Sequence, residues 1–173
     1  MYFASVGWNP QILRADMDGK NKIVLANLSS IGQTIIDLVL DIPRLRLFFS
    51  DQSNNVIRYV DLTSLEVHTL LSGSSLHGPT GLAMLNDTLY WTAHQDGGMY
   101  DGFIFEADVT NRTVRMIADG FNKPAGLYAY NSRAPKTPGD YYNYNSILLE
   151  TLISEVISRV KNGQAKNIIT NNL

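Results

Sequence analysis

The sequence predicts an all-β protein, namely part of a β-propeller with about three four-stranded blades, followed by one C-terminal amphipathic α-helix. Three observations carry this prediction: an internal repeat, short strand-like runs inside each repeat, and a helical pattern that begins only near residue 146. The chain has 173 residues, of which 45% are hydrophobic and 17% are charged. That composition is sufficient for one folded domain with its own core.

The repeat is visible in three independent registers of similar residues. An aromatic segment begins at Tyr2, Phe48 and Tyr90, which are 46 and 42 residues apart. A second segment ends in an aspartate at Asp16, Asp61 and Asp108, which are 45 and 47 residues apart. A leucine register contains Leu38, Leu82 and Leu127, which are 44 and 45 residues apart. Because the three registers share one period, we infer a repeat architecture.

Each full repeat contains four short runs that are typical of β-strands. They cover 34–41, 46–51, 56–62 and 67–72 in the second repeat, and 81–85, 88–93, 103–109 and 114–119 in the third. Four strands in one repeat of this length indicate a propeller blade, because a helical solenoid would need apolar residues three and four apart.

The first repeat has no opening strand, since its aromatic segment begins at residue 2, and residues 126–131 are an opening strand with nothing after it. We therefore expect twelve strands, which is the number in three four-stranded blades. A propeller ring needs about four to eight blades, so one chain is not expected to close a ring by itself.

Three segments resemble the YWTD (class B) repeats of low-density lipoprotein receptor relatives, namely LYWTAHQDGG, RLFFSDQSNNVIRYVDL and MYFASVGWNPQILRADMDG. The resemblance covers about residues 1–131. It implies a partial six-bladed YWTD β-propeller, since six such repeats close the ring in that family. The chain departs from the motif in two ways: Tyr90-Trp91-Thr92 alone keeps its first three letters, and Asp51 alone keeps its final aspartate.

Two arrangements would complete such a ring. In the first, the chain is a piece of a larger receptor that supplies the remaining blades. In the second, two copies assemble head to tail, and residues 126–131 of each copy complete the first repeat of the other.

The segment after the repeats has a different pattern. Residues 132–145 are rich in proline, glycine and tyrosine and are expected to be a linker. Residues 146–163 place apolar side chains three and four apart from Leu149 to Val160, which predicts an amphipathic helix before a tail at 164–173. The helix either covers apolar blade surface or docks a partner or a second copy.

The loops between the second and third strands of each blade are the candidate ligand-binding face, because equivalent loops share one end of a propeller. This loop is longest in the third repeat. The candidate ligand-binding residues are Trp8, Asn54, His94, Asp96, Tyr100 and Asp101. The alternative is that the long loop is only a solvated, glycine-rich hairpin.

The motif residues are expected to be structural. Successive side chains of a strand point to opposite faces, so the aromatic pairs should pack between neighbouring blades. These structural residues are Tyr2, Phe3, Phe48, Phe49, Asp51, Tyr90, Trp91 and Thr92.

Several function classes are disfavoured by the sequence. A net charge of −2 without a basic block argues against nucleic-acid binding. The chain has no cysteine, no apolar run long enough to span a bilayer, and no signal-peptide pattern. Catalytic motifs such as GxSxG and HExxH are missing, so we expect no catalytic residues, no bound metal and no cofactor.

The resemblance implies a non-enzymatic module that binds protein ligands, lipoprotein-like or signalling, in endocytic uptake or as a signalling co-receptor. It implies a place on the extracellular face of the plasma membrane, with the membrane reached only through flanking segments. Glycosylation would then be expected at Asn27, Asn86 and Asn111, which begin N-x-S/T sequons. The alternatives are a propeller hydrolase of the gluconolactonase or strictosidine-synthase kind, or an inactive truncated product.

Overall fold

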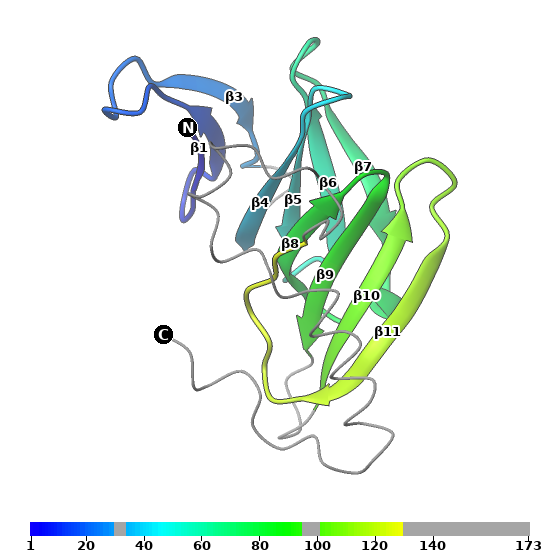
Figure 1. Cartoon of the computed structure of the whole chain (residues 1–173). Coiled ribbons are helices and arrows are strands. Elements are labelled where there is room, and N and C mark those ends of the chain that lie inside the picture. The colour runs from blue at the N-terminus through cyan, green and yellow to red at the C-terminus, as the bar shows by residue number, and fades with distance from the viewer. Residues whose placement is uncertain (30–33, 95–100, 130–173) are drawn as a thin grey trace, which may run out of the picture. The chain divides into compact units, whose positions relative to one another are not determined.

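The computed structural model describes residues 1–29, 34–94 and 101–129. Within these ranges the chain contains eleven β-strands in three antiparallel sheets, together with one short 3₁₀ helix, Ser74–Leu76 (Figure 1). The prediction of an all-β fold is therefore confirmed. The expected linker, helix and tail over 132–173 lie outside the described residues. The chain divides into two compact units, Met1–Leu127 and Tyr128–Leu173, and the three sheets belong to the first.

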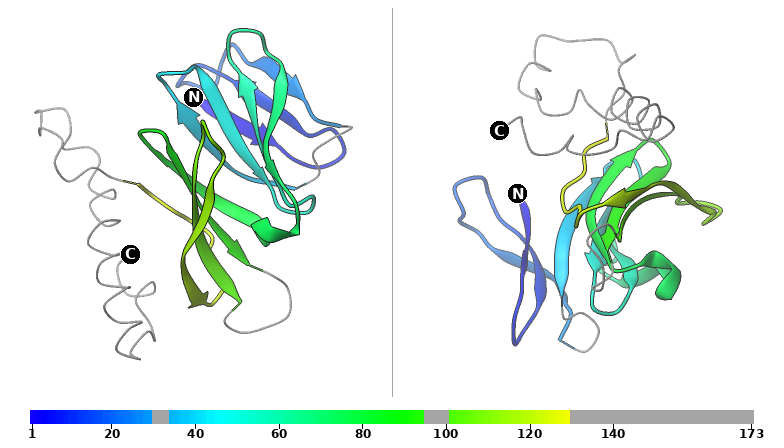
Figure 2. Two further views of the ribbon diagram at one scale, coloured as in Figure 1. Left: turned by 90° about the vertical axis from the view of Figure 1, so that its right-hand side faces the viewer. Right: turned by 90° about the horizontal axis from the view of Figure 1, so that it is seen from below.

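Each sheet corresponds to one blade. Blade 1 has the strand order β1-β2-β3, formed by Tyr2–Ser5, Gln11–Arg14 and Ile23–Asn27. Blade 2 has the order β4-β5-β6-β7, formed by Ile35–Asp41, Arg46–Asp51, Val56–Asp61 and Val67–Ser72. Blade 3 has the order β8-β9-β10-β11, formed by Pro79–Leu85, Thr88–His94, Gly102–Asp108 and Val114–Phe121. Figure 2 shows the three sheets side by side as separate twisted ribbons.

The twelfth strand that the sequence predicts, over residues 126–131, is not formed among the described residues. Residues 126–129 have no strand pairing, and residues 130 and 131 lie outside the described part of the chain. A β-strand is defined by its ladder of hydrogen bonds to a neighbour. No strand pairs with this segment among the described residues, so the sequence pattern of an opening strand is present without the strand itself.

The core lies between the blades. One cluster of buried side chains, which includes Phe49, joins blades 1 and 2. A second cluster, which includes Phe48 and Trp91, joins blades 2 and 3. Phe48 and Phe49 are adjacent on β5, so their strand alternation sends one ring into each cluster. Both faces of blade 2 are therefore covered by a neighbouring blade.

The repeated aspartates close equivalent turns after the third strand of blades 2 and 3. Asp61 accepts hydrogen bonds from the backbone N–H groups of Thr63 and Ser64, at 2.8 and 3.0 Å. Asp108 accepts the same two bonds from the next turn, at 2.7 and 3.0 Å. The backbone donors stabilise the ionised carboxylate and hold the pKa of both aspartates below its ordinary value of 3.8. The recurring aspartate therefore stabilises the turn that follows it in both blades.

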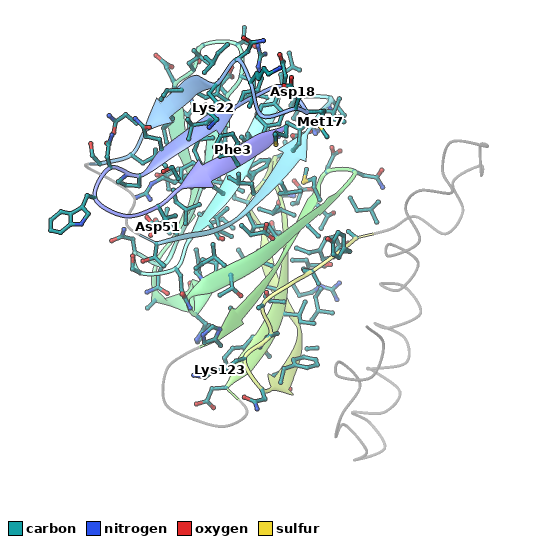
Figure 3. All side chains as sticks on the ribbon, turned by 90° about the vertical axis from the view of Figure 1, so that its left-hand side faces the viewer. Phe3, Met17, Asp18, Lys22, Asp51 and Lys123 are labelled. Carbon is teal, nitrogen blue, oxygen red and sulfur yellow. The ribbon has the colours of Figure 1, made fainter. Side chains whose placement is uncertain are left out.

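The blades have two ends, which we call the loop end and the turn end. The loop end carries the loops between second and third strands, and the turn end carries the hairpin turns such as that between β2 and β3. Figure 3 shows Met17 and Asp18 of the β2–β3 turn at one end and Lys123, which follows β11, at the other. No helix among the described residues is long and apolar enough to cross a membrane.

Candidate functional site

The third position of the aromatic motif connects one blade to the next. In blade 2, the Ser50 hydroxyl accepts a hydrogen bond from the N–H of Asp37 at 3.1 Å and donates to the carbonyl of Thr80 at 2.6 Å. Asp37 lies on the opening strand of the same blade, and Thr80 lies on the opening strand of blade 3. One buried hydroxyl therefore fixes the separation of two consecutive opening strands.

Blade 3 repeats this contact. The Thr92 hydroxyl accepts a hydrogen bond from the N–H of Gly81 at 2.9 Å and lies 3.2 Å from the carbonyl oxygen of Ala125, to which it donates. The backbones approach so closely here that a Cβ on Gly81 would lie 2.0 Å from the Ala125 oxygen. Glycine is therefore required at this position. The Ala125 carbonyl accepts a hydrogen bond from Thr92 of blade 3, just as the Thr80 carbonyl accepts one from Ser50 of blade 2.

The fourth motif position forms a buried ion pair in blade 2. Asp51 is fully buried, and Arg58 donates to its carboxylate at 2.7 Å. Asn54 and Ser53 from the following turn donate to the same carboxylate at 2.8 and 3.2 Å. Four polar groups thus satisfy one another at the loop end of the blade, as a buried charge requires.

The other two blades lack both members of this pair. Ala93 replaces the aspartate in blade 3, and Phe105 stands in the register of Arg58. In blade 1 the corresponding residues are Ser5 and Leu13. An unpaired buried charge is costly, so the two positions must change together. The stacking of Phe105 on Trp91 fills the space with apolar contact instead, with ring centroids 5.2 Å apart.

The aromatic motif residues differ in burial according to which blade faces them. Trp91, Phe48 and Phe49 are fully buried between blades. Phe3 and Tyr90 are half-buried. The side chain of Phe3 points away from blade 2 on the outer face of blade 1, and that of Tyr90 has the matching place on the outer face of blade 3, as the strand alternation requires. Among the described residues no further blade covers these two faces.

The candidate ligand-binding residues that the structure describes, Trp8, Asn54, His94 and Asp101, lie in different surroundings at the loop end. Trp8 lies in the β1–β2 loop with its side chain fully exposed, and Val6 beside it is also exposed. The loop is anchored because the Pro10 carbonyl accepts a 2.8 Å hydrogen bond from the N–H of Leu28. An exposed tryptophan on an anchored loop presents a large apolar surface at low entropic cost.

Two other candidates, Asn54 and His94, lie where blades 2 and 3 meet. His94, at the end of β9, has its Nε2 atom 3.3 Å from the side-chain nitrogen of Gln52 in the β5–β6 turn. Asn54 belongs to the same turn and is exposed, and its side-chain N–H donates a hydrogen bond to Asp51. Asp101 is exposed just before β10, whereas Asp96 and Tyr100 lie outside the described residues. The structure therefore joins the Asn54 turn to His94 and places Trp8 on blade 1.

Sequence reasoning missed two participants in this region. Gln52 links the two loops, yet a single glutamine after the motif aspartate gives no pattern that predicts such a contact. Val6 enlarges the apolar tip of the Trp8 loop, and its place two residues from the tryptophan was the available signal. Among the described residues, no group of three or more histidines or acidic side chains is arranged to hold a metal ion.

The three sequons begin at exposed asparagines. Asn86 lies in the β8–β9 turn and Asn111 in the β10–β11 turn, so both are at the turn end of blade 3. Asn27 ends β3 at the loop end, where its side chain accepts hydrogen bonds from the backbone and hydroxyl of Ser29. All three side chains are accessible to a modifying enzyme.

Comparison with known proteins identifies these repeats. No family model matches the chain. The chain is 33% identical over 114 residues to low-density lipoprotein receptor-related protein 5 of Mus musculus, and 31% identical over the same length to that of Homo sapiens. The chain is built from YWTD repeats of the low-density lipoprotein receptor family. The aligned region covers 66% of this chain and 6% of each relative, so the YWTD repeats described here span a small part of those receptors.

Solved structures agree on the fold of the YWTD repeats. The chain matches one in a crystal structure of a nidogen/laminin complex with a TM-score of 0.63 and 18% identity, over 75% of this chain and 48% of that chain. It matches TolB from Acinetobacter baumannii with a TM-score of 0.53 and 14% identity, over 74% of this chain and 32% of that chain. At these identities the likeness shows the β-propeller architecture alone.

Proposed function

We propose that this chain is a non-enzymatic, protein-ligand-binding part of an extracellular receptor of the low-density lipoprotein receptor kind. The observation that carries the proposal is the 33% identity over 114 residues to a receptor-related protein, within the blades themselves. The blades devote their buried polar groups to structure: Ser50, Thr92 and the Asp51–Arg58 pair all hold strands together. Binding is therefore assigned to the loops.

The loop end of the blades is the proposed ligand face. Trp8 supplies an exposed aromatic anchor of the type that dominates protein interfaces. Asn54, His94 and Asp101 supply hydrogen-bonding and charged groups from blades 2 and 3, and Asp96 and Tyr100 belong to the same proposed loop. An apolar anchor with polar neighbours is the usual anatomy of a protein-binding surface.

The proposed ligands are lipoprotein-like or signalling proteins, taken up or sensed at the extracellular side of the plasma membrane. Residues 1–131 are the propeller part in this proposal, and the helix proposed over 146–163 is joined to it by the linker at 132–145. Further blades come from the rest of a larger receptor or from a second copy of the chain. Contact with the membrane runs only through flanking segments.

A paired substitution at the two ends of blade 1 tests the ligand face. The immobilised 173-residue chain is exposed to purified low-density lipoprotein particles and, separately, to conditioned medium from cultured cells. Trp8→Ala is compared with Met17→Ala, because Met17 is also a strongly exposed apolar residue and lies at the turn end. We expect Met17→Ala to retain what the unmodified chain binds and Trp8→Ala to lose it. Two outcomes overturn the proposal: equal binding by the two variants, or no binding by the unmodified chain.

The non-enzymatic part of the proposal has its own test. The chain is incubated with glucono-δ-lactone in the presence of Ca²⁺, Mn²⁺ or Zn²⁺, and lactone opening is followed by acid release. We expect no rate above that of the buffer. Turnover that depends on protein and metal would instead support a propeller hydrolase.

A further inference from the structure

We propose that the loop end of the blades binds its protein ligand through an uncharged surface, and that the ligand presents an uncharged patch with a large apolar side chain to it. The inference deepens the proposed function and rests on it, because it takes a protein ligand at the loop end as given. It adds the chemical class of the ligand's contact surface and the response of binding to salt.

The two ends of the blades differ in how many charged side chains they carry. The hairpin turns of the turn end contain eight, four of each sign, namely Asp16, Asp18, Lys20, Lys22, Arg44, Glu66, Asp87 and Arg112. The described loop residues of the loop end include two, Asp101 and Lys123, and the sequence adds Asp96 to the loop of Asp101. All three come after β9. The described residues of the earlier loops therefore contain no aspartate, glutamate, lysine or arginine.

The charges nearest to these earlier loops are already neutralised. Asp51 precedes the β5–β6 turn and is fully buried, and the largely buried Arg58 donates to its carboxylate at 2.7 Å. Each member of the pair satisfies the other, so neither is available to attract a charged ligand.

Amide side chains take the place of charges in the β5–β6 turn. The side-chain N–H of Asn54 donates to Asp51 at 2.8 Å, and the side-chain oxygen of Asn55 accepts from the N–H of Gly78 at 2.7 Å. One half of each amide is therefore held by the chain itself. The other half, an oxygen in Asn54 and an NH₂ group in Asn55, has no hydrogen-bond partner among the described residues. Both are neutral groups that can bond to a ligand.

The apolar part of the surface is the tip of the β1–β2 loop. Trp8 is fully exposed and Val6 is 60% exposed. Residues 1–13 contain no charged side chain, so the tip has no charged neighbour in its own strand pair. The cores of protein interfaces are depleted of charged residues and enriched in tryptophan. A ligand that brought a charge onto this surface would lose the hydration of that charge without gaining a counter-charge.

A library of random peptides displayed on phage is the probe for the class of ligand. The library is selected on the immobilised 173-residue chain, and every peptide that also binds the Trp8→Ala variant is removed. We expect the retained peptides to be depleted of acidic and basic residues relative to the input library and enriched in large apolar residues. Retained peptides that are rich in acidic or basic residues overturn the inference, and so does a selection that retains none.

Salt dependence gives a second readout on the same peptides. Their affinities are measured at about 0.1 M and about 1 M NaCl, between which the Debye length falls from about 10 Å to about 3 Å. We expect the dissociation constant to change by less than about twofold, because an uncharged contact is not screened. A larger loss of affinity in high salt indicates charge attraction and overturns the inference.

A pair of opposite charges beside Trp8 gives a third test. Asn9 is exposed, and Asn9→Lys and Asn9→Asp place the two signs at one position. An uncharged patch meets both at the same cost, so we expect the two variants to bind each peptide equally within about twofold. A preference for one sign beyond that factor overturns the inference. Met17→Lys and Met17→Asp place the same charges at the turn end and are expected to leave the affinity unchanged.

The inference and the proposed function fail on different results. Binding of charged, salt-sensitive peptides that depends on Trp8 overturns the inference and leaves a loop end that binds proteins. Equal capture of lipoprotein particles or secreted proteins by Trp8→Ala and Met17→Ala overturns the proposed function itself.

Discussion

The hydroxyl of Ser50 donates a 2.6 Å hydrogen bond to the carbonyl of Thr80, which lies in the next blade. The same hydroxyl accepts from the opening strand of its own blade, so it is satisfied on both sides. Thr92 repeats the arrangement in blade 3. The hydroxyl at this motif position in blades 2 and 3 therefore has a structural role, because it holds the inner strand of its own blade to the segment that follows.

Removing the Ser50 hydroxyl should destabilise the interface between blades 2 and 3. Ser50→Ala leaves the N–H of Asp37 and the carbonyl of Thr80 without this partner in a buried site, which costs about 1–3 kcal/mol. The free energy of unfolding, measured by urea titration, should fall by that amount. Ser72→Ala, at an exposed position of β7, is the control and should change it by less than about 0.5 kcal/mol. Equal effects would show that the bridge contributes nothing.

The Asp51–Arg58 pair should behave as a coupled unit. Asp51→Ala leaves a largely buried guanidinium without its carboxylate and should cost about 3–5 kcal/mol. Asp51→Ala/Arg58→Phe introduces the Ala93 and Phe105 pair of blade 3 and should cost less than Asp51→Ala alone. A double-mutant cycle by chemical denaturation measures the coupling. Strict additivity of the two single effects would refute it.

The two tryptophans of the chain should respond in opposite ways to truncation. Trp91 is fully buried between blades, so Trp91→Ala should lower the free energy of unfolding by about 3–5 kcal/mol. Trp8 is fully exposed, so Trp8→Ala should change it by no more than about 0.5 kcal/mol. Fluorescence of each single-tryptophan variant provides a check, since only the emission of Trp91 should shift to longer wavelength on unfolding.

Stability should fall on acidification through the turn aspartates. Backbone donors, from Ser64 and then Thr63 for Asp61, and from Asn111 and then Thr110 for Asp108, hold the pKa of both carboxylates below 3.8 in the folded chain. Their contribution is therefore fully present above pH 3.8 and is lost as the pH falls through the lower, folded-state pKa. Asp61→Asn/Asp108→Asn should flatten the decline in melting temperature below that pH. Asp119→Asn, at an exposed position of β11, is the control, and an identical decline in both variants argues against the assignment.

Secretion should reveal whether the exposed sequons are used. On expression through a eukaryotic secretory pathway, we expect glycans at Asn27, Asn86 and Asn111, because all three side chains are exposed. Each single change to glutamine should reduce the mass by one glycan, as measured by intact mass spectrometry. A mass that enzymatic deglycosylation does not alter would contradict this expectation.

Much of the fold could be predicted from the sequence because each strand carries a local signal. Alternating apolar residues and turn aspartates such as Asp61 are short-range features, and they placed the strands of blades 2 and 3 within a few residues. The segment from Gly126 shows the limit of that reasoning. Its pattern is that of a strand, but pairing depends on a neighbour that no local pattern supplies.

The candidate site was less predictable for the same reason. Trp8 stands out in any reading of the sequence, whereas the approach of Gln52 to His94 depends on how blades 2 and 3 pack. The role of Asp51 was also only half visible. Asp51 could be recognised as the last residue of the motif, but its partner Arg58 became recognisable only through the strand register.

The close approach of Ala125 to Gly81 has a consequence for how such chains can be recombined. The natural unit of exchange is offset from the sheet: it begins at the second strand of one blade and ends with the opening strand of the next. A graft cut between β7 and β8 would separate the Ser50 hydroxyl from the Thr80 carbonyl that it matches. Chimeras joined after β8 keep Ser50 and Thr80 on the same fragment, but they place Gly81 and Ala125 on different fragments, so the grafted backbone must fit against a glycine that tolerates no Cβ.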